Sequence, residues 1–552
     1  MTDWLIPPGF IMLAAAPLAC FVGAAKRLLL LPPLAMLLLA ALLPEGAALH
    51  WRFMGYDITP LQVTPLGRLF AVTFSVMTLG GMMFAMRQAK KSELAGASLC
   101  AGGAVTVSLC GDFITFFIFW ELMAIASTLI VFAAATPASA AAGRRYLLLH
   151  ILGGVVLLYG IAGLVGESGD ASLRAVAPAA FHEWMILAGV LLNAGAPPLS
   201  AWVADAYPEA SPGGTVFLSA FTTKSAVFAL LAVFAGSDIL VPIGLYMIFY
   251  GIVYALLEND MRRILAYSIV NQVGFMVVGA GIGTELAVNG AAAHASAHII
   301  YKALLLMSAG SVLYMSGRRK CDELGGLYAT MKVTTICGVV GAVSISAMPL
   351  TSGFVSKALI SEAAHGAAMT WTWLLLVAAS AGVFLHAGIK FPWFVFFRRK
   401  PAGDEPDDPP VNMQLAMIFF ALLCLAVGVF PPLLYGLLPH PVDYAPYAGT
   451  HVAAQLELLL LSALAFFVML PLLKRTPTIS LDTDWFYRKL PALSGALAAP
   501  AAAALRRACA GRAPGRALWP ALSALAQRDS ARLSVFIVVV LAALAAFLLL
   551  HY

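Results

Sequence analysis

Residues 113–135 read FITFFIFWELMAIASTLIVFAAA, a run in which Glu121 is the only charged side chain. A helix needs roughly 20 apolar residues to cross the hydrocarbon core of a bilayer. The run therefore predicts a membrane-spanning helix that carries a carboxylate near its middle. A charge at the bilayer centre costs about 2.5 to 3.5 kcal/mol, so its presence favours a role in transport over a hydrogen bond that packs two helices together.

The rest of the chain has the same apolar character. Of its 552 residues, 61% are hydrophobic and 11% are charged, which is far less charge than a soluble domain carries. Apolar windows of spanning length recur almost from end to end, and we count about sixteen. We therefore predict an all-α polytopic protein of the cell (inner) membrane. The first window lacks a basic flank and a cleavage site, so we expect it to be retained as a span.

Loop charges predict the orientation and the organisation of the chain. Basic pairs such as Lys90 with Lys91 and Arg262 with Arg263 follow odd-numbered spans, which places the N-terminus outside. The net charge of +6 is interpreted as a topology signal. The predicted parts are N-terminal spans at 1–110, a translocating core at 111–400, a cytoplasmic loop at 401–411, further spans at 412–473, a cytoplasmic or interfacial segment at 474–533 and a last span at 534–552.

Lys224 lies in TVFLSAFTTKSAVFALL, residues 215–231, too far from either end for its ammonium group to reach water by extending along the helix. A buried lysine can gain and lose a proton near neutral pH, which favours a proton site. The alternative interpretation is a fixed ion pair with a carboxylate such as Glu121.

His294, His298 and Lys302 are spaced four residues apart, so one helix face presents them in a line of roughly 12 Å. A lone buried histidine is more often a packing residue. Three titratable groups on one stripe instead favour a proton relay through water.

Two helices are predicted to break at membrane depth. Lys357 ends the run SAMPLTSGFVSK, in which Pro349 and Gly353 interrupt the helix. Asn193 precedes Pro197 and Pro198 in LLNAGAPPLSAW, which gives a second break without a charge. Broken helices are tolerated where they line protein or water, and transport sites lie there. Because the breaks are five spans apart, they predict an internal repeat with inverted copies.

Other ionisable residues have less certain roles. Lys390 and His386 precede a third break at Pro392, and Lys390 either takes part in transport or anchors the helix near the basic residues 398–400. His150 is interpreted as a structural residue, and Asp112 as a helix cap near the interface.

The sequence indicates neither a cofactor nor a metal site. The seven cysteines form no CxxC pair, and there is no GxxxxGK[ST] motif for nucleotide phosphates. No self-contained catalytic site is predicted, so enzymatic activity enters only through a possible translocase role in an NADH:quinone oxidoreductase-like complex. We expect protons, possibly exchanged for Na⁺ or K⁺, a lipid bilayer and other membrane subunits as partners, and no nucleic acid.

The runs FWELMAIAS, WVADAYPEASP, DMRRILAYS, HIIYKALLL and PLTSGFVSK together resemble the antiporter-like family shared by Mrp cation/proton antiporters and the membrane arm of complex I. The run LDTDWFYRKL near the C-terminus adds to this resemblance, and within the family the sequence most resembles the D-type Mrp subunit. The resemblance implies two inverted five-helix repeats. It also implies proton-path roles for a set of five residues, namely Glu121, Lys224, His298, Lys302 and Lys357.

One departure from the family pattern concerns Asn193, where the family usually has a lysine, and Ser200, where it often has a histidine. Because asparagine cannot carry a proton as charge, three alternatives stay open. Lys224 becomes the partner of Glu121, this half-channel is inactive, or Lys390 compensates.

The function expected from these residues is proton or cation/proton translocation by a subunit of an Mrp-type antiporter. In this mechanism Glu121 controls the protonation of Lys224, and Lys357 governs exchange at the far end after protons pass His298 and Lys302. It requires that these groups are held away from lipid and in contact with internal water. The alternatives are a proton-pumping subunit of an oxidoreductase or hydrogenase complex, and a haem-bearing quinone enzyme with histidine ligands.

Overall fold

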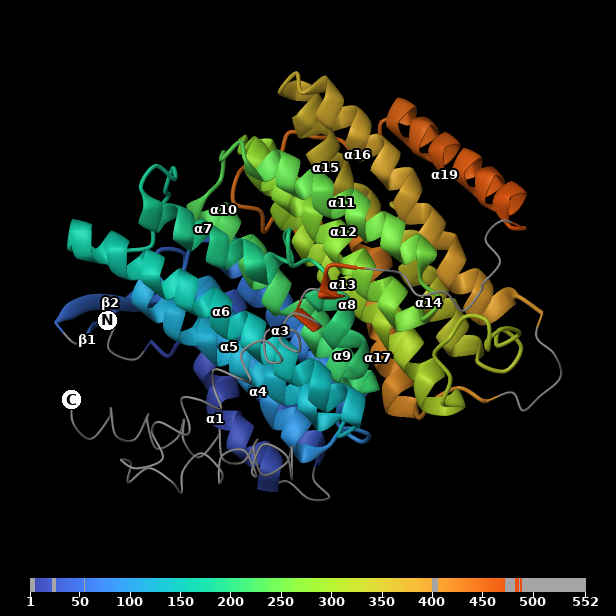
Figure 1. The fold of residues 1–552 in the computed structure, drawn as a ribbon, viewed down its shortest axis with the longest axis horizontal. Helices are drawn as coiled ribbons and strands as arrows, with labels where there is room; N and C mark the ends of the chain where they lie inside the picture. Colours follow the sequence, from blue (N-terminus) through green and yellow to red (C-terminus); the bar gives the residue numbers. More distant parts are fainter. Residues whose placement is uncertain are drawn as a thin grey trace, which may run out of the picture.

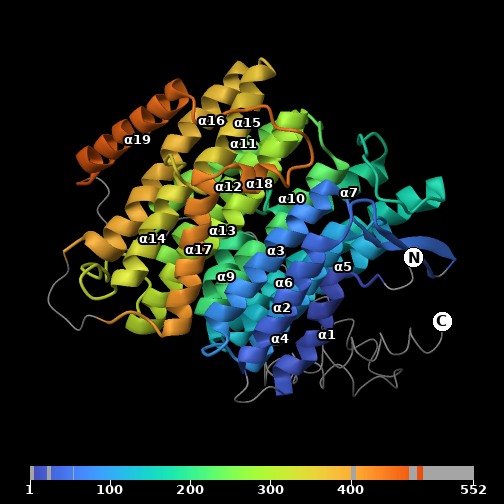
Figure 2. The same ribbon diagram turned by 180° about the vertical axis from the view of Figure 1, so that it is seen from behind.

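The computed structural model describes residues 5–21, 26–53, 55–399, 406–471, 482–485 and 487–488. The predicted last span at 534–552, most of the predicted segment 474–533 and part of the predicted loop 401–411 lie outside the described residues. The described part is a bundle of tilted helices (Figure 1). Seen from behind, α2, α3 and α17 cover one side of this bundle (Figure 2).

The elements follow one another along the chain with short connections. The first are α1 (Pro8–Phe21), η1 (Lys26–Leu30), α2 (Leu31–Leu42), β1 (Ala48–Phe53), β2 (Tyr56–Gln62), α3 (Pro65–Ala85), α4 (Lys91–Leu109), α5 (Phe113–Ala133) and α6 (Pro137–Ser168). Next come α7 (Phe181–Ala194), α8 (Trp202–Ala206), η2 (Tyr207–Glu209), α9 (Pro212–Ala220), α10 (Thr222–Val233), α11 (Leu240–Leu257), α12 (Met261–Ile282) and α13 (Glu285–Ser316). The last are α14 (Lys332–Ile345), α15 (Ser352–Gly366), α16 (Thr370–Val383), η3 (Phe384–Lys390), η4 (Trp393–Phe397), α17 (Val411–Val429), α18 (Pro432–Tyr435) and α19 (Gly449–Met469).

The predicted polytopic helical fold is confirmed. Among the described residues, 11 helices are long and apolar enough to cross a membrane, and four shorter apolar helices accompany them. The predicted span at residues 113–135 forms α5, and the predicted run 215–231 forms α9 and α10, which Phe221 separates. The total of about sixteen spans stays a prediction, because the last of them is not described.

A short antiparallel hairpin, β1 with β2, is an addition that the all-α prediction missed. Its register pairs Ala48 with Gln62 and Phe53 with Tyr56. The hairpin is tied to the bundle because the backbone N–H of Thr59 donates to Oδ2 of Asp112 over 2.8 Å. Hydropathy windows identify membrane spans, but they do not detect a hairpin of mixed polar and apolar residues between two spans.

The order of elements repeats across the core. Asp112 and Asp260 are the N-caps of α5 and α12, and they form isolated antiparallel bridges with Ser172 and Lys320, respectively. α6 and α13, which follow, are each 32 residues long and end at a left-handed glycine. A shorter helix and a break come next in both halves. These correspondences support the predicted repeats, and they confirm Asp112 as a helix cap.

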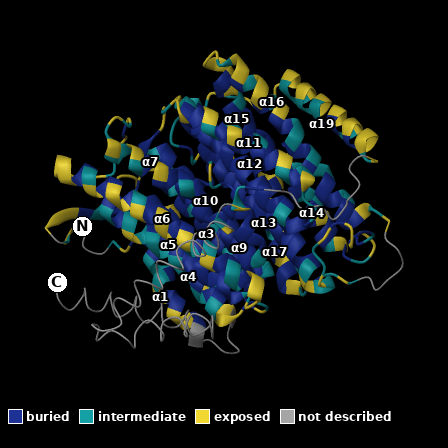
Figure 3. Ribbon diagram, in the orientation of Figure 1, coloured by how far each residue is buried: buried dark blue, intermediate teal, exposed yellow. Residues whose placement is uncertain are grey.

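The core of the molecule lies around α12 and α13. The most hydropathic window of α12 is 100% buried inside the chain, whereas that of α19 is 17% buried. Figure 3 shows this difference, because the buried centre is dark blue and much of α19, at the edge, is exposed and drawn in yellow. Buried titratable groups on α12 and α13 are therefore enclosed by other helices of the same chain.

The breaks predicted near Asn193 and Pro349 are both present. The third predicted break, at Pro392, is wrong, because residues 384–397 continue the helix, largely in π-helical form. The first separates α7 from α8, and Gly195 begins it with a φ of 80°. The second separates α14 from α15, where Ala347 and Leu350 have φ values of 57° and 70°. Left-handed conformations cost non-glycine residues about 1 to 3 kcal/mol and gather at functional sites. The second break is thus held in place by the packing around it.

Candidate functional site

Lys224 lies in the first turn of α10, next to the interruption at Phe221. Its Nζ donates to the carbonyl oxygen of Ser219 over 2.7 Å and to Oγ1 of Thr223 over 3.0 Å. The interruption leaves the last carbonyls of α9 without helical partners, which makes them available to the ammonium group. The side chain is fully buried, as the sequence predicted.

Lys302 and Lys357 have similar neutral surroundings. Nζ of Lys302 donates to Oγ of Ser268 over 3.0 Å. Nζ of Lys357 donates over 3.0 Å to the carbonyl oxygen of Ile345, the last residue of α14, and lies 5.1 Å from the centre of the Phe275 ring. The break between α14 and α15 therefore supplies an oxygen ligand for an ammonium group, as its position in the sequence suggested.

A hydrogen-bond network joins the helix that carries the histidines to the helix that carries Lys357. Nδ1 of His294 lies 3.1 Å from Oγ of Ser356, which directly precedes Lys357. Nε2 of His294 and the hydroxyl of Tyr301 each lie 3.1 Å from Oε1 of Gln272. Side-chain hydrogen bonds of this network thus connect α15, α13 and α12 to one another.

His298 lies beside this network without a hydrogen bond to it. Its ring centre is 5.2 Å from that of Tyr301 and 6.3 Å from that of His294, and neither ring nitrogen has a partner among the described residues. Buried polar atoms without protein partners are the usual positions of internal water, and His298 has two of them.

Glu121 is placed differently from the lysines. It is partly exposed at the surface of this chain, on the same face of α5 as the exposed Ile118. Its Oε1 atom is nevertheless covered and has no hydrogen-bond partner among the described residues. The carboxylate lies against α6, since a Cβ atom built on Gly154 would be 2.1 Å from Oε1. The expectation that this group is wholly enclosed by the chain is therefore not met.

The alternative of a fixed ion pair between Lys224 and Glu121 is not seen. Within the described residues, no salt bridge joins Glu121, Lys224, Lys302 or Lys357 to an opposite charge. The three lysines are instead held by carbonyl, hydroxyl and aromatic neighbours. The structure therefore contains a row of buried lysines and histidines able to exchange protons, with Glu121 at a partly exposed face of the same bundle.

Comparison with known proteins places this row in a family. The model described as NADH:quinone oxidoreductase/Mrp antiporter, TM, matches residues 110–384, a range that includes every titratable group named so far in this site. The chain belongs to this family of membrane proteins. The resemblance read from the sequence motifs is thereby confirmed.

Relatives in this family include transporters and redox proteins. The A/B component of a probable K⁺/H⁺ antiporter of Rhizobium meliloti is 31% identical over 355 residues, which cover 60% of this chain and 35% of that protein. The chain thus spans about a third of the length of this relative. The L component of the NADH-quinone oxidoreductase of Escherichia coli is 27% identical over 413 residues, which cover 70% of this chain and 66% of that one.

The fold also matches a solved member of the family. One chain of the Mrp complex from Dietzia sp. DQ12-45-1b superposes with a TM-score of 0.71 at 20% identity, over 82% of this chain and 100% of that one. Further relatives include both A-type and D-type components of Na⁺/H⁺ antiporters.

Lys390 of this family member has a different environment from the other buried lysines. Its Nζ donates to the carbonyl oxygens of Ala255, Leu256 and Glu258 over 2.6, 2.8 and 2.6 Å. These oxygens end α11, and a cation at a helix C-terminus is favoured by the helix dipole. The geometry supports the anchoring interpretation of Lys390. His386, one turn away on the π-helix η3, is fully buried, and its Nδ1 lies 2.9 Å from the carbonyl oxygen of Gly382.

Asp205 is a buried charged residue that our interpretation of the sequence missed. It lies in the WVADAYPEASP motif, and its carboxylate accepts two hydrogen bonds of 2.7 Å from Arg145 of α6. Arg488 of the C-terminal segment also contacts it. The signal was an aspartate in the otherwise apolar run WVADAY, residues 202–207, at the start of this motif.

The described part of the C-terminal segment is docked on the core. Asp482 is buried and accepts hydrogen bonds from the hydroxyls of Tyr250, over 2.8 Å, and Tyr267, over 2.6 Å. LDTDWFYRKL contributed to the D-type resemblance in the sequence, and the structure shows that its first aspartate reaches between α11 and α12.

Arg262 was interpreted only as a topology charge, yet it is buried. Its guanidinium donates to the carbonyl oxygens of Pro208, Ala210 and Ser211 over 2.7, 2.9 and 2.9 Å. Arg262 thereby fixes the chain that leads from the first break into α9. A loop charge and a buried guanidinium cannot be told apart by counting charges near a span.

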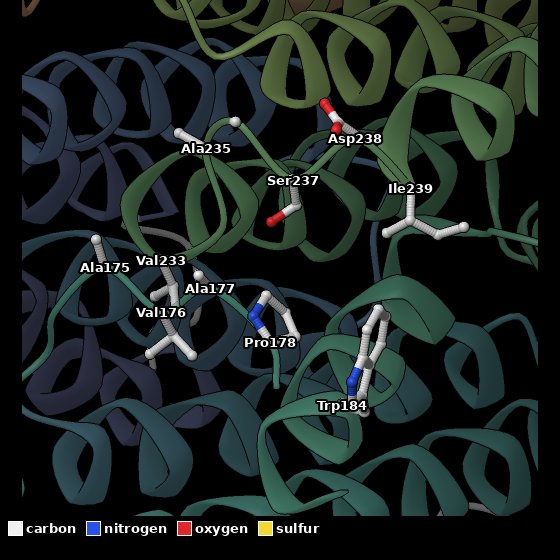
Figure 4. A pocket seen from close by; sticks show the side chains of 11 residues that line it. Ala175, Val176, Ala177, Pro178, Trp184, Val233, Ala235, Ser237, Asp238 and Ile239 are labelled. Carbon is white, nitrogen blue, oxygen red and sulfur yellow. The ribbon is translucent and has the colours of Figure 1, made fainter. Parts of the chain in front are cut away.

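A pocket of about 510 Å³ opens at the far end of α10 (Figure 4). Among the described residues that line it, Asp238 is the one that carries a charge, and Trp184 forms part of the wall. The backbone N–H of Val176 donates to the carbonyl oxygen of Val233 over 2.7 Å and ties the lining loop to the helix end. Residues 226–231 of α10 are buried between this pocket and Lys224, so the pocket is separate from the lysine.

Proposed function

We propose that this chain translocates protons across the cytoplasmic membrane as one component of a multisubunit Mrp-type cation/proton antiporter. The D-type component is the form that the sequence resembles. The proposal goes beyond family membership because the matched relatives carry their activities as larger proteins or assemblies.

The observation that carries the proposal is that three buried lysines contact no opposite charge among the described residues. Lys224, Lys302 and Lys357 are held by neutral oxygen atoms in that part of the chain. A buried ion pair fixes both charges, because breaking it leaves one of them unpaired at high cost. A lysine with neutral neighbours has no such fixed counter-charge and is suited to exchange protons with water.

The route follows the groups between these lysines. Glu121 controls the protonation of Lys224, whose charge acts on His298. From His298 the proton passes to Lys302, and His294 with Ser356 links this helix to Lys357, which governs exchange at the far end. Internal water completes the route where the protein groups do not touch, and the unpartnered nitrogens of His298 offer it binding positions.

Partner proteins follow from the position of Glu121. An ionisable group at membrane depth does not face acyl chains in a stable protein, because the cost is several kcal/mol. The partly exposed face of α5 is therefore covered by a neighbouring membrane protein in the working assembly.

The experiment that tests the proposal measures collapse of a pH gradient in everted membrane vesicles that contain the chain with its partner subunits. We expect Lys224→Ala and Glu121→Ala each to lower transport at least tenfold while the protein still inserts. Asp238→Asn in the separate pocket is the matched control and leaves transport unchanged. Transport at the wild-type rate by both variants would contradict the proposal.

A second candidate is a proton-pumping component of a redox-driven complex, favoured by the similarity to the L component of the oxidoreductase. The two functions differ in the source of energy. Purification of the intact assembly under mild conditions distinguishes them, because only the redox complex brings proteins with flavin or iron-sulfur absorbance.

A further inference from the structure

His150 of α6 is a buried titratable group that the route above does not use. Its Nδ1 lies 2.9 Å from the carbonyl oxygen of Tyr146, and its side chain is 1% exposed. Because a carbonyl oxygen only accepts, Nδ1 carries the hydrogen and Nε2 carries the free electron pair. Nε2 has no partner among the described residues. The imidazole is therefore oriented with a free proton-accepting atom.

The imidazole lies beside the first break. Its ring is stacked on Tyr146 with 3.9 Å between ring centres, and it meets the Trp202 ring edge to face at 4.7 Å. The indole N–H of Trp202 donates over 3.0 Å to the carbonyl oxygen of Leu192, the residue before Asn193. His150 is thus fixed next to the position at which this chain has asparagine. Oδ1 of Asn193 is also buried, with no partner in the described part of the chain.

The same helix face leads to Glu121. Gly154, against which the Glu121 carboxylate lies, follows His150 by four residues, about 6 Å along the helix axis. Both Oε1 of Glu121 and Nε2 of His150 lack partners in the described structure. Both atoms belong to or lie against the same stretch of α6 and are suited to bind internal water, since buried water usually makes about three hydrogen bonds to polar groups that lack other partners.

In the opposite direction, hydroxyl groups lie between the ring that stacks on His150 and the start of α10. The hydroxyl of Tyr146 donates to Oγ of Ser127 over 2.9 Å and lies 3.4 Å from Oγ1 of Thr222. Thr222 begins α10, two residues before Lys224. Polar side chains are therefore present between the neighbourhood of His150 and the turn that carries the lysine.

From these contacts we infer that His150 is the proton carrier between Glu121 and Lys224, in the half of the protein where Asn193 provides no charge. This inference rests on the proposed function. In the first step Nε2 takes a proton through water from the Glu121 carboxylic acid, which leaves a carboxylate and an imidazolium. In the second step Nε2 gives the proton through water to the neutral amine of Lys224, which restores the neutral imidazole. No electron is gained or lost.

The test uses His150→Gln and His150→Phe in the vesicle assay with all partner subunits. Glutamine keeps a polar side chain and phenylalanine keeps the ring that stacks on Tyr146, but neither accepts a proton at this position. We expect both to lower proton transport at least tenfold, with insertion and Tm close to those of the wild type. His182→Gln at the start of α7 is the matched control and keeps the wild-type rate.

A rescue separates proton transfer from packing. A lysine at position 193 would place an amine at the same break, so the double variant His150→Gln with Asn193→Lys regains most of the transport. A packing role predicts no such recovery. Wild-type transport by His150→Gln, or a loss that Asn193→Lys leaves uncorrected, overturns the inference. If Lys224→Ala abolishes transport in the same assay, the proposed function stands even when the inference about His150 fails.

Discussion

Arg145 and Asp205 form a bidentate salt bridge, with both N–O distances at 2.7 Å, between the start of α6 and the chain that follows the first break. The Asp205 side chain is 3% exposed. The pair therefore links the helix that carries His150 to the motif that carries Trp202. Bidentate pairs of this kind fix geometry as well as adding energy.

Replacing Asp205 by alanine is expected to lower the stability of the protein by roughly 3 kcal/mol, because Arg145 is left without its carboxylate. Thermal unfolding in detergent measures the effect. The matched control is Asp170→Ala, which removes the exposed pair of Asp170 with Arg174, whose side chains are 56% and 33% exposed. Such pairs contribute about 0 to 1 kcal/mol. Equal losses for the two variants would show that burial does not matter here.

Replacement by methionine is expected to have different effects at Lys390 and at Lys357. Lys390→Met removes three hydrogen bonds to the end of α11 and should lower the stability by roughly 3 kcal/mol or more, since a hydrogen bond to a charged group contributes about 1.5 to 3 kcal/mol net. Lys357→Met removes one such bond and should retain most of its stability while losing transport. Paired measurements of Tm and of proton flux check both. A stable Lys390→Met protein without transport would instead assign Lys390 to the proton route.

Gly154→Ala moves the Glu121 carboxylate without removing it. The new Cβ atom would be 2.1 Å from Oε1, so the carboxylate has to rotate away from α6. We expect transport to fall roughly tenfold, which corresponds to about 1.4 kcal/mol in the barrier. Gly166→Ala on the same helix meets nothing within 4 Å and keeps the wild-type rate. Flux in vesicles, with both proteins inserted to equal levels, decides between them.

Glu258, in the loop between α11 and α12, gives the fold a pH dependence. Burial raises the pKa of this carboxyl, but the charge of Arg263 and the backbone N–H groups of Asn259 and Asp260 outweigh it, so the pKa is lowered in the folded protein. A lowered carboxyl pKa stabilises the fold above the unfolded pKa, and this contribution is lost as the pH falls through the folded value.

Glu258→Gln should therefore lower the stability by roughly 1 kcal/mol at pH 7, and the difference from the wild type should shrink as the pH falls below about 4. Thermal unfolding between about pH 7 and about pH 3 follows both proteins. Glu167→Gln serves as the control, because the Glu167 side chain is 73% exposed. A difference that grows towards acid pH would contradict the assignment.

The fold was largely predictable because the bilayer demands long apolar windows, and these are visible without any structure. The breaks near Asn193 and Pro349 were predictable for a related reason, since proline lacks a backbone N–H and disfavours continuation of the preceding helix. The hairpin at residues 48–62 was not, because strand pairing depends on contacts between two segments.

The candidate site was predictable residue by residue but not in its connections. Lys224, Lys302 and Lys357 were identified because a charge within an apolar window is conspicuous. The sequence did not specify which oxygen atoms these lysines contact, nor that Lys390 binds the carbonyl oxygens at the end of α11. The role inferred for His150 was also out of reach, since it depends on contacts with residues on α5, α8 and α10.

The amino-acid sequence by itself determined that this chain resides in a membrane, that two helices break near Asn193 and Pro349, and that Lys224, Lys302 and Lys357 are buried, since hydropathy and turn-forming residues are local properties. The tertiary structure decided which oxygen each ammonium group meets, that Glu121 lies at a partly exposed face, and that His150 packs against Tyr146 and Trp202. Partners at membrane depth come from helices far apart in the chain, and only their packing brings the side chains within hydrogen-bonding distance.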